Sequence, residues 1–143
     1  MRTIEEIRQL LLELSACTGV SGDEGGIAKK IEELLSPAAD CRRTPLGNVI
    51  AVQNAGAPKK LMTAAHMDEV GFVITNITEN GLLKFTTVGN IRPEVLSGRD
   101  VLVGGKTPGV ICAKPVHLLK GDEFEKPVPV NELAIDIGAD TRE

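Results

Sequence analysis

The chain has very few aromatic residues: three Phe among 143 residues, with no Trp and no Tyr. Aromatic side chains form the stacking surfaces of sugar-binding grooves and of sites for single-stranded nucleic acid, so both kinds of site are disfavoured. Hydrophobic residues make up 42% of the chain and charged residues 25%, which is the composition of a globular protein. The core must therefore be built mainly from Val, Ile, Leu and Ala.

Long runs of one residue type are also missing. No basic run exceeds two residues and the formal net charge is −4, which argues against a nucleic-acid partner. No apolar stretch approaches the ~20 residues of a membrane span, and the acidic, amphipathic beginning is not a signal peptide. The three cysteines are widely spaced, with no Cys-x-x-Cys, as is typical of inert thiols in a reducing compartment. We therefore expect a cytoplasmic protein without a membrane or nucleic-acid partner.

Two stretches in the first part of the chain have apolar residues at helical spacing, each preceded by a Ser/Thr-x-x-Glu capping box. The expected pairs and helices are Thr3 with Glu6 for residues 3–16, and Ser21 with Glu24 for residues 24–35. Residues 1–66 also contain short strands, so we expect mixed helix and strand there, the beginning of an α/β layer.

From about residue 70 to residue 135 the pattern is almost entirely that of short strands between Gly and Pro turns, which suggests a small barrel or sandwich. Asn80-Gly81 predicts a tight hairpin between its flanking strands. The charged, proline-rich residues 120–129 predict a mobile loop. The strands expected over the whole chain are residues 42–44, 49–52, 60–65, 70–77, 82–88, 101–103, 109–113 and 133–137.

The most informative motif stands at the end of the apolar run 60–65, where His66 is followed by Asp68 and Glu69. Positions i and i+2 of a strand share a face, so the imidazole and the first carboxylate are expected to project together. A metal-ligating histidine needs such a carboxylate to fix its tautomer and orientation. The carboxyl end of a central strand is also where α/β proteins place their sites. One His-x-Asp alone cannot complete a catalytic zinc site, which needs three protein ligands and a water.

Less specific interpretations compete for each candidate residue. His66 has the alternative of a hydrogen-bonded surface histidine, and His117 is expected to be packed or solvated rather than a ligand. Ser21 is expected to cap a helix rather than act as a nucleophile. Asp136 and Asp140 are expected to serve turns and caps, with metal binding as the minority interpretation. The sequence contains no His-Glu-x-x-His, P-loop or Gly-x-Ser-x-Gly motif.

Taken in order, the motifs resemble those of the co-catalytic metallo-aminopeptidases of the tetrahedral or deblocking type, the glutamyl aminopeptidase family, some of whose members carried the name endoglucanase. The Ala-His-Met-Asp-Glu-x-Gly-Phe stretch is the most specific of them. The matching segments are residues 18–22 with Glu24, 46–48, 65–72, 80–81, 88–89, 109–111, His117 and 136–139.

The resemblance implies an α/β fold class in three segments. Residues 1–68 would be the N-terminal part of an α/β catalytic domain, residues 69–135 a small all-β, barrel-like dimerisation domain, and residues 136–143 the return to the catalytic domain. It also implies hydrolysis of N-terminal residues from peptides by a homo-oligomer that associates through its β domain.

By the same resemblance, two divalent metals, zinc or cobalt, would share a bridging water. His66 would be a ligand of one metal, and Asp68 would be the catalytic-site carboxylate that holds its ring. The remaining ligands and the catalytic glutamate of the family fall beyond Glu143, so this chain supplies at most one clear ligand.

The last residues predict the start of a further helix, since Asp140 or Thr141 would cap it and Arg142-Glu143 would begin it. We therefore expect the chain to be a portion of a longer enzyme and to be inactive alone. Two alternatives stay open. One is a self-associating β module whose exposed strands pair with another chain. The other, a glycoside hydrolase with two carboxylates, is disfavoured by the scarcity of aromatics.

Overall fold

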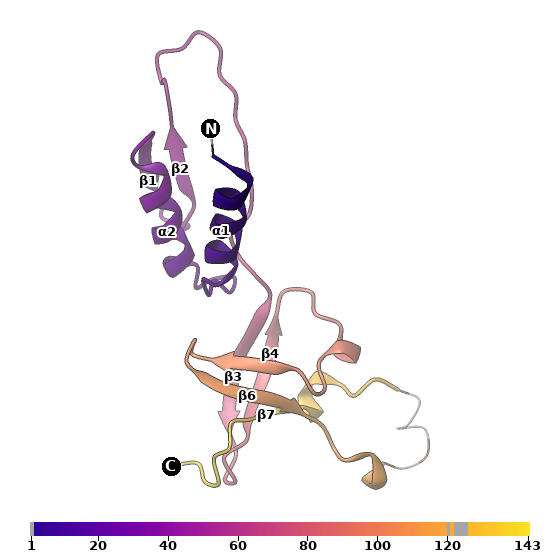
Figure 1. The fold of residues 1–143 in the computed structure, drawn as a ribbon. Coiled ribbons are helices and arrows are strands. Elements are labelled where there is room, and N and C mark those ends of the chain that lie inside the picture. Colours follow the sequence, from indigo (N-terminus) through magenta and orange to yellow (C-terminus); the bar gives the residue numbers. More distant parts are fainter. Residues whose placement is uncertain (1, 120, 122–125) are drawn as a thin grey trace. The chain divides into compact units, whose positions relative to one another are not determined.

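The structure, a computed structural model, describes residues 2–119, 121 and 126–143. Much of the loop expected over residues 120–129 therefore lies outside the described residues. The chain divides into two compact units, Met1–Glu69 and Val70–Glu143 (Figure 1). No helix in the described part is both long and apolar enough to cross a membrane.

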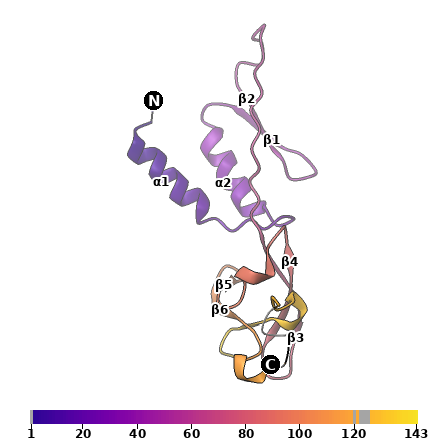
Figure 2. The same cartoon turned by 90° about the vertical axis from the view of Figure 1, so that its right-hand side faces the viewer.

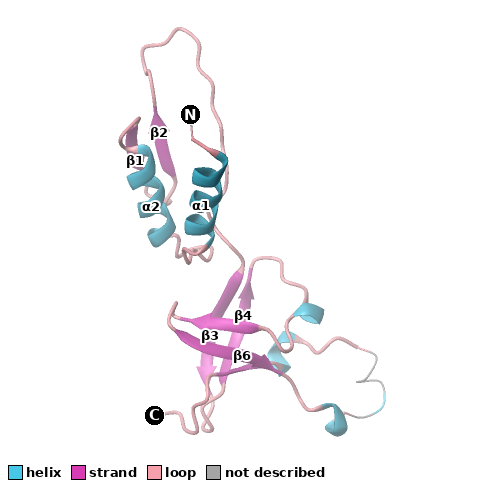
Figure 3. Cartoon of the chain, in the orientation of Figure 1, coloured by secondary structure: helices cyan, strands magenta, loops and turns pink. Residues whose placement is uncertain are grey.

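The first unit contains two helices followed by a β-hairpin (Figure 3). The strands of the hairpin are antiparallel, with Asp40 opposite Val52. Ile27 and Ala28 of the second helix are its buried hydrophobic residues, at 5% and 1% exposure. Both helices and both strands are confirmed close to their expected places. Their bounds are α1 Ile4–Ser15, α2 Gly25–Leu35, β1 Asp40–Arg43 and β2 Val49–Val52.

The capping box of α1 is confirmed. The hydroxyl of Thr3 accepts a hydrogen bond from the Glu6 backbone N–H at 3.2 Å, and the Glu6 carboxylate accepts from the Thr3 N–H at 2.6 Å. Two of the N–H groups that lack a partner inside the helix are thereby satisfied.

The second predicted capping box is wrong. The N-cap of α2 is Glu24, and its side chain makes no capping bond but accepts from the Gly22 N–H at 2.7 Å. A capping box needs helical backbone directly after the cap, whereas Gly22 has a φ of +94°. Ser21 therefore stands before the helix, in a turn closed by a bond from the Asp23 N–H to the Val20 carbonyl.

The strand predicted over residues 60–65 is also wrong. This stretch pairs with no other segment of the described chain, and Leu61 and Met62 are 93% and 88% exposed. A strand needs a neighbour that aligns its own N–H and C=O groups. The hairpin strand β2 pairs only with β1, so the apolar pattern of residues 60–65 indicates a burial that the described residues do not provide.

The second unit is a five-stranded antiparallel sheet in the order β3-β4-β7-β6-β5. The hairpin predicted at Asn80-Gly81 is confirmed, with Gly81 at a φ of +78°. At the other edge β5 pairs with β6 (Figure 2). The fold is thus mixed helix and strand with a curled sheet, whose edges β3 and β5 do not pair within the described residues. The strands are β3 Gly71–Ile77, β4 Leu83–Val88, β5 Asp100–Val103, β6 Thr107–Cys112 and β7 Ala134–Asp136.

The core of the second unit lies on the inner face of this sheet and is almost wholly aliphatic. Phe72 packs edge-to-face on Phe85, with ring centroids 5.0 Å apart. Ile111 and Leu133 are completely buried. The buried cluster consists of Leu83, Phe85, Leu96, Ile111, Leu133 and Ile135.

Replacing Ile111 by Ala should lower the free energy of unfolding by about 2–5 kcal/mol, because it leaves a cavity where no side-chain surface was exposed. Val110→Ala, on the outward face of the same strand where Val110 is 43% exposed, is the matched control and should change stability by less than ~0.5 kcal/mol. Urea unfolding measures both. Equal losses would contradict this placement of the core.

The N-terminus of α1 should loosen in acid. The hydrogen bond from the Thr3 backbone N–H, followed by that from its hydroxyl, holds the pKa of Glu6 below its ordinary value. Because the folded pKa is the lower one, the stabilisation is complete above the unfolded value of about 4.3 and is lost as the pH falls through the folded pKa. Cα chemical shifts of residues 4–8, followed by NMR against pH, should show this loss. In Glu6→Gln the same shifts should not respond to this titration.

Candidate functional site

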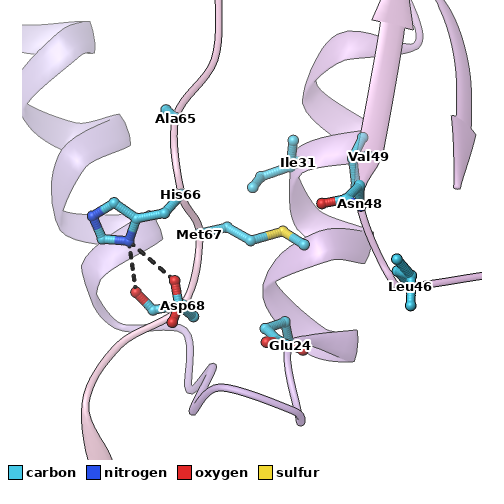
Figure 4. A pocket seen from close by; sticks show the side chains of 9 residues that line it. All are labelled: Glu24, Ile31, Leu46, Asn48, Val49, Ala65, His66, Met67 and Asp68. Atoms are coloured by element: carbon cyan, nitrogen blue, oxygen red, sulfur yellow. Dashed lines mark hydrogen bonds and ion pairs between the residues drawn. The ribbon is translucent and has the colours of Figure 1, made fainter. Parts of the chain in front are cut away.

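His66 lies in the extended segment that leads from the hairpin to Glu69, and its side chain is 86% exposed. Its Nδ1 is 3.0 Å from the backbone carbonyl of Asp68 and 3.2 Å from Oδ1 of the same residue (Figure 4). Both partners are acceptors, so Nδ1 carries the proton in the neutral ring. The lone pair is consequently on Nε2, at the outer edge of an exposed imidazole, which is the arrangement of a metal-ligating histidine.

Asp68 uses its two carboxylate oxygens for different partners. Oδ1 faces His66, and Oδ2 accepts a hydrogen bond from the Ser21 hydroxyl at 2.5 Å. The Ser21 bond is the main cause that lowers the pKa of Asp68; its own backbone N–H and His66 lower it further, against an opposing effect of partial burial. Asp68 is therefore an anion at neutral pH and accepts, rather than donates, the proton shared with the imidazole.

Residues 19–21 are joined to residues 68–69 by a set of contacts that we call the clasp. The Glu69 N–H donates to the Gly19 carbonyl at 2.8 Å, and the Gly19 N–H donates to Glu69 Oε1 at 3.2 Å. Val20 and Glu69 form an isolated parallel bridge, and the Ser21–Asp68 bond completes the set. The clasp connects segments 47 to 50 positions apart, so it fixes the residues next to His66 without a β-sheet.

Gly19 is what allows this close approach. It is buried, and a Cβ at this position would lie 2.8 Å from Cγ2 of Ile27 in α2. A larger residue would require either the Ile27 side chain or the loop to shift, and a shift of the loop would move the carbonyl that accepts from Glu69.

A cavity of about 350 Å³ lies beside this segment (Figure 4). Met67 extends toward Ile31 of α2, whereas the His66 ring lies on the other side of the backbone. Glu24 and Asn48 supply polar groups to the cavity wall. Side chains alternate along extended backbone even without a neighbouring strand, which is why His66 and Asp68 share a side as the sequence indicated.

His117 and Asp136 take no part in this arrangement. His117 is exposed in a short 3-10 turn of the second unit, Val116–Leu118. Asp136 accepts a hydrogen bond from the Gly138 N–H at 2.8 Å, which confirms the turn interpretation. Ser21 is the residue whose role the sequence interpretation missed; the glycine directly after it was the available indication that it does not cap α2.

The described residues contain no group of three or more His, Cys, Asp or Glu side chains able to hold a metal ion together. A catalytic zinc needs three protein ligands and one open position. Within the described part of the chain, His66 thus offers a single oriented nitrogen rather than a complete metal site.

Comparison with known proteins identifies the family to which this chain belongs. Residues 47–143 match the family of M42 glutamyl aminopeptidases. The lysyl aminopeptidase of Pyrococcus furiosus is 33% identical over 142 residues, covering 94% of this chain and 40% of that protein. The TET aminopeptidase of the marine sediment archaeon Thaumarchaeota archaeon SCGC AB-539-E09 is similar with a TM-score of 0.84 and 32% identity, over 94% of this chain and 39% of that one.

The TET1 peptidase of Pyrococcus horikoshii is similar with a TM-score of 0.71 and 35% identity, over 92% of this chain and 40% of that one. The chain belongs to the M42 glutamyl aminopeptidase family, and the resemblance inferred from its motifs is confirmed. It spans about two-fifths of the length of these relatives.

Proposed function

We propose that this chain contributes to a metal-dependent aminopeptidase that removes N-terminal residues from peptides. The observation that supports the proposal most directly is the His66 ring, whose Nδ1 is held by Asp68 and whose Nε2 is exposed, in the part of the chain that matches the family. In this proposal His66 is one metal ligand. Asp68 is the carboxylate that orients it and raises its basicity.

The donor set fits one of the two divalent metals, zinc or cobalt, that such a site would use. An imidazole nitrogen suits either metal, and the anionic Asp68 favours the tautomer with Nε2 unprotonated. When bound, the metals would supply Lewis acidity to the peptide carbonyl and lower the pKa of the attacking water. The protein's own part is to hold the ring at a fixed orientation, which the clasp supports at Asp68 and Glu69.

The same proposal assigns roles to the segments. Residues 1–68 would form the N-terminal part of an α/β catalytic domain, residues 69–135 a dimerisation domain, and residues 136–143 the return to the catalytic domain. The division of the chain between Glu69 and Val70 supports this assignment. The exposed Leu61 and Met62 support it too, since residues 60–65 have the pattern of a strand that requires pairing partners.

The P. horikoshii TET1 peptidase can assemble into a tetrahedron or a large octahedral shell. By analogy we propose a homo-oligomer that associates through the second unit. Edge strands β3 and β5 carry exposed apolar side chains, among them Val73 at 50% and Leu102 at 57%. The three cysteines are unpaired, which suits a cytoplasmic location. The alternative from the sequence is a β module that self-associates without catalysis. No contact among the described residues supports that alternative more than it supports the aminopeptidase.

The chain alone should not hydrolyse aminoacyl-p-nitroanilides in the presence of Co²⁺ or Zn²⁺. The reason is that its described residues hold no three-ligand group. An active aminopeptidase in the same buffer verifies the assay. A metal-dependent hydrolytic activity that co-purifies with the wild-type chain and is absent from His66→Ala would contradict this expectation.

In a chimera, this chain replaces the matching segment of the P. furiosus lysyl aminopeptidase. The folded, metal-loaded chimera should release N-terminal residues, and His66→Ala should abolish that activity because a ligand is lost. Asp68→Asn should lower kcat/KM by about 10–100-fold, the usual effect of removing the carboxylate behind a metal-bound histidine. His117→Ala is the matched control and should leave the rate unchanged. A fully active His66→Ala chimera would refute the proposed ligand.

A further inference from the structure

Ser21 is the polar side chain in this region to which the proposed metal chemistry gives no role. It does not cap α2, whose N-cap is Glu24. Nor is it placed as an activated nucleophile, since its proton is directed to Asp68 Oδ2 and the imidazole presents Nδ1 to the same aspartate rather than to the serine. Its hydroxyl nevertheless makes a short hydrogen bond, 2.5 Å, to a residue 47 positions away.

The position of Ser21 is fixed independently of that bond. The preceding residues are held by the two hydrogen bonds between Gly19 and Glu69 and by the bridge between Val20 and Glu69. Gly19 is itself packed against Ile27 of α2. The Ser21 hydroxyl therefore approaches Asp68 from a loop that is held against α2 and against Glu69, the residue after Asp68.

The Asp68 side chain is exposed enough to rotate, and a hydrogen bond from Ser21 would restrict that rotation. This side chain is 41% exposed, and the hydrogen bond that Oδ1 accepts from His66 Nδ1 is longer than the one that Oδ2 accepts from Ser21, at 3.2 Å against 2.5 Å. Without a partner on Oδ2 the carboxylate would be free to rotate into solvent. His66 Nδ1 would then keep only the Asp68 backbone carbonyl as an acceptor.

We propose that Ser21 is a positioning residue: its hydroxyl holds Asp68 Oδ2 so that Oδ1 stays on His66 Nδ1 and the ring presents Nε2 outward. The orientation of the ring follows from the contacts in this chain alone. The consequence for metal binding rests on the proposed function. The Gly-Val-Ser-Gly loop thereby belongs to the site, although it lies far from His66 in the sequence.

The first test measures the tautomer of His66 by ring ¹⁵N chemical shifts in the intact 143-residue chain, at pH about 8, where a histidine is neutral. The wild type should have the Nδ1–H form in excess. In Ser21→Ala the ratio of Nδ1–H to Nε2–H should fall about fivefold, as expected for the loss of one hydrogen bond. His117 in the same spectra is the internal reference and should not change.

Matched variants separate this role from a general effect on folding. Ser21→Thr and Ser21→Val have nearly the same shape and differ in the hydroxyl, so Thr should keep the wild-type ratio and Val should lose it. Ser36→Ala removes another exposed serine hydroxyl, which contacts the Glu33 carbonyl at 3.5 Å, and should have no effect. An unchanged His66 ratio in both Ser21→Ala and Ser21→Val would overturn the proposal. If Ser21→Ala fails to fold, the Thr and Val pair decides.

The second test titrates Zn²⁺ alone into the same chains and follows the His66 ring. Wild type should show a weak site at His66, and Ser21→Val should bind about tenfold more weakly than Ser21→Thr. Equal affinities of these two variants would overturn the consequence for metal binding. If zinc leaves the wild-type His66 unperturbed while the tautomer ratio still depends on the hydroxyl, the consequence for metal binding fails and the positioning role stands. The proposed function is tested separately, since a fully active His66→Ala chimera would refute it.

Discussion

The candidate site depends on one set of contacts, the clasp between residues 19–21 and residues 68–69. The segment that carries His66 is not held by a sheet, and its apolar residues just before the histidine are almost fully exposed. What fixes its far end is the pair of backbone and side-chain bonds between Gly19 and Glu69, together with the Ser21–Asp68 bond. Without the Ser21 bond the Asp68 carboxylate would lose its partner on Oδ2, and His66 Nδ1 would be assured only of the Asp68 backbone carbonyl as an acceptor.

The two units differ in how much of their own apolar surface they bury. The second unit forms a buried cluster from its strands and the segments next to them, in which the described residues include three side chains at 0–1% exposure. Among the described residues of the first unit, two hydrophobic residues are buried, both in α2, and α1 has none buried. On α1, Ile4 is 87% and Leu11 64% exposed. Burial of apolar surface is the main favourable term in folding, so the first unit has much less to stabilise it than the second.

Family membership and local geometry answer different questions about this protein. The match to M42 glutamyl aminopeptidases gives the family, over a chain that spans about two-fifths of its relatives' length. The contacts of His66 give the atoms: a proton on Nδ1, a lone pair on Nε2 and an anionic Asp68 behind the ring. Together they assign the proposed ligand role of His66 to one atom, Nε2.

Local patterns in the sequence determined both helices, the capping box at Thr3 and the hairpin at Asn80-Gly81, because each rests on interactions within a few residues. The pairing of His66 with Asp68 belongs to the same class, since they are two positions apart. The strand over residues 60–65 and the cap at Ser21 were predicted wrongly, because a strand exists only with a neighbour and a serine hydroxyl takes whichever partner the fold brings near. Only the tertiary structure could decide that Ser21 bonds to Asp68, since that contact joins segments 47 positions apart and leaves no periodic pattern in the sequence.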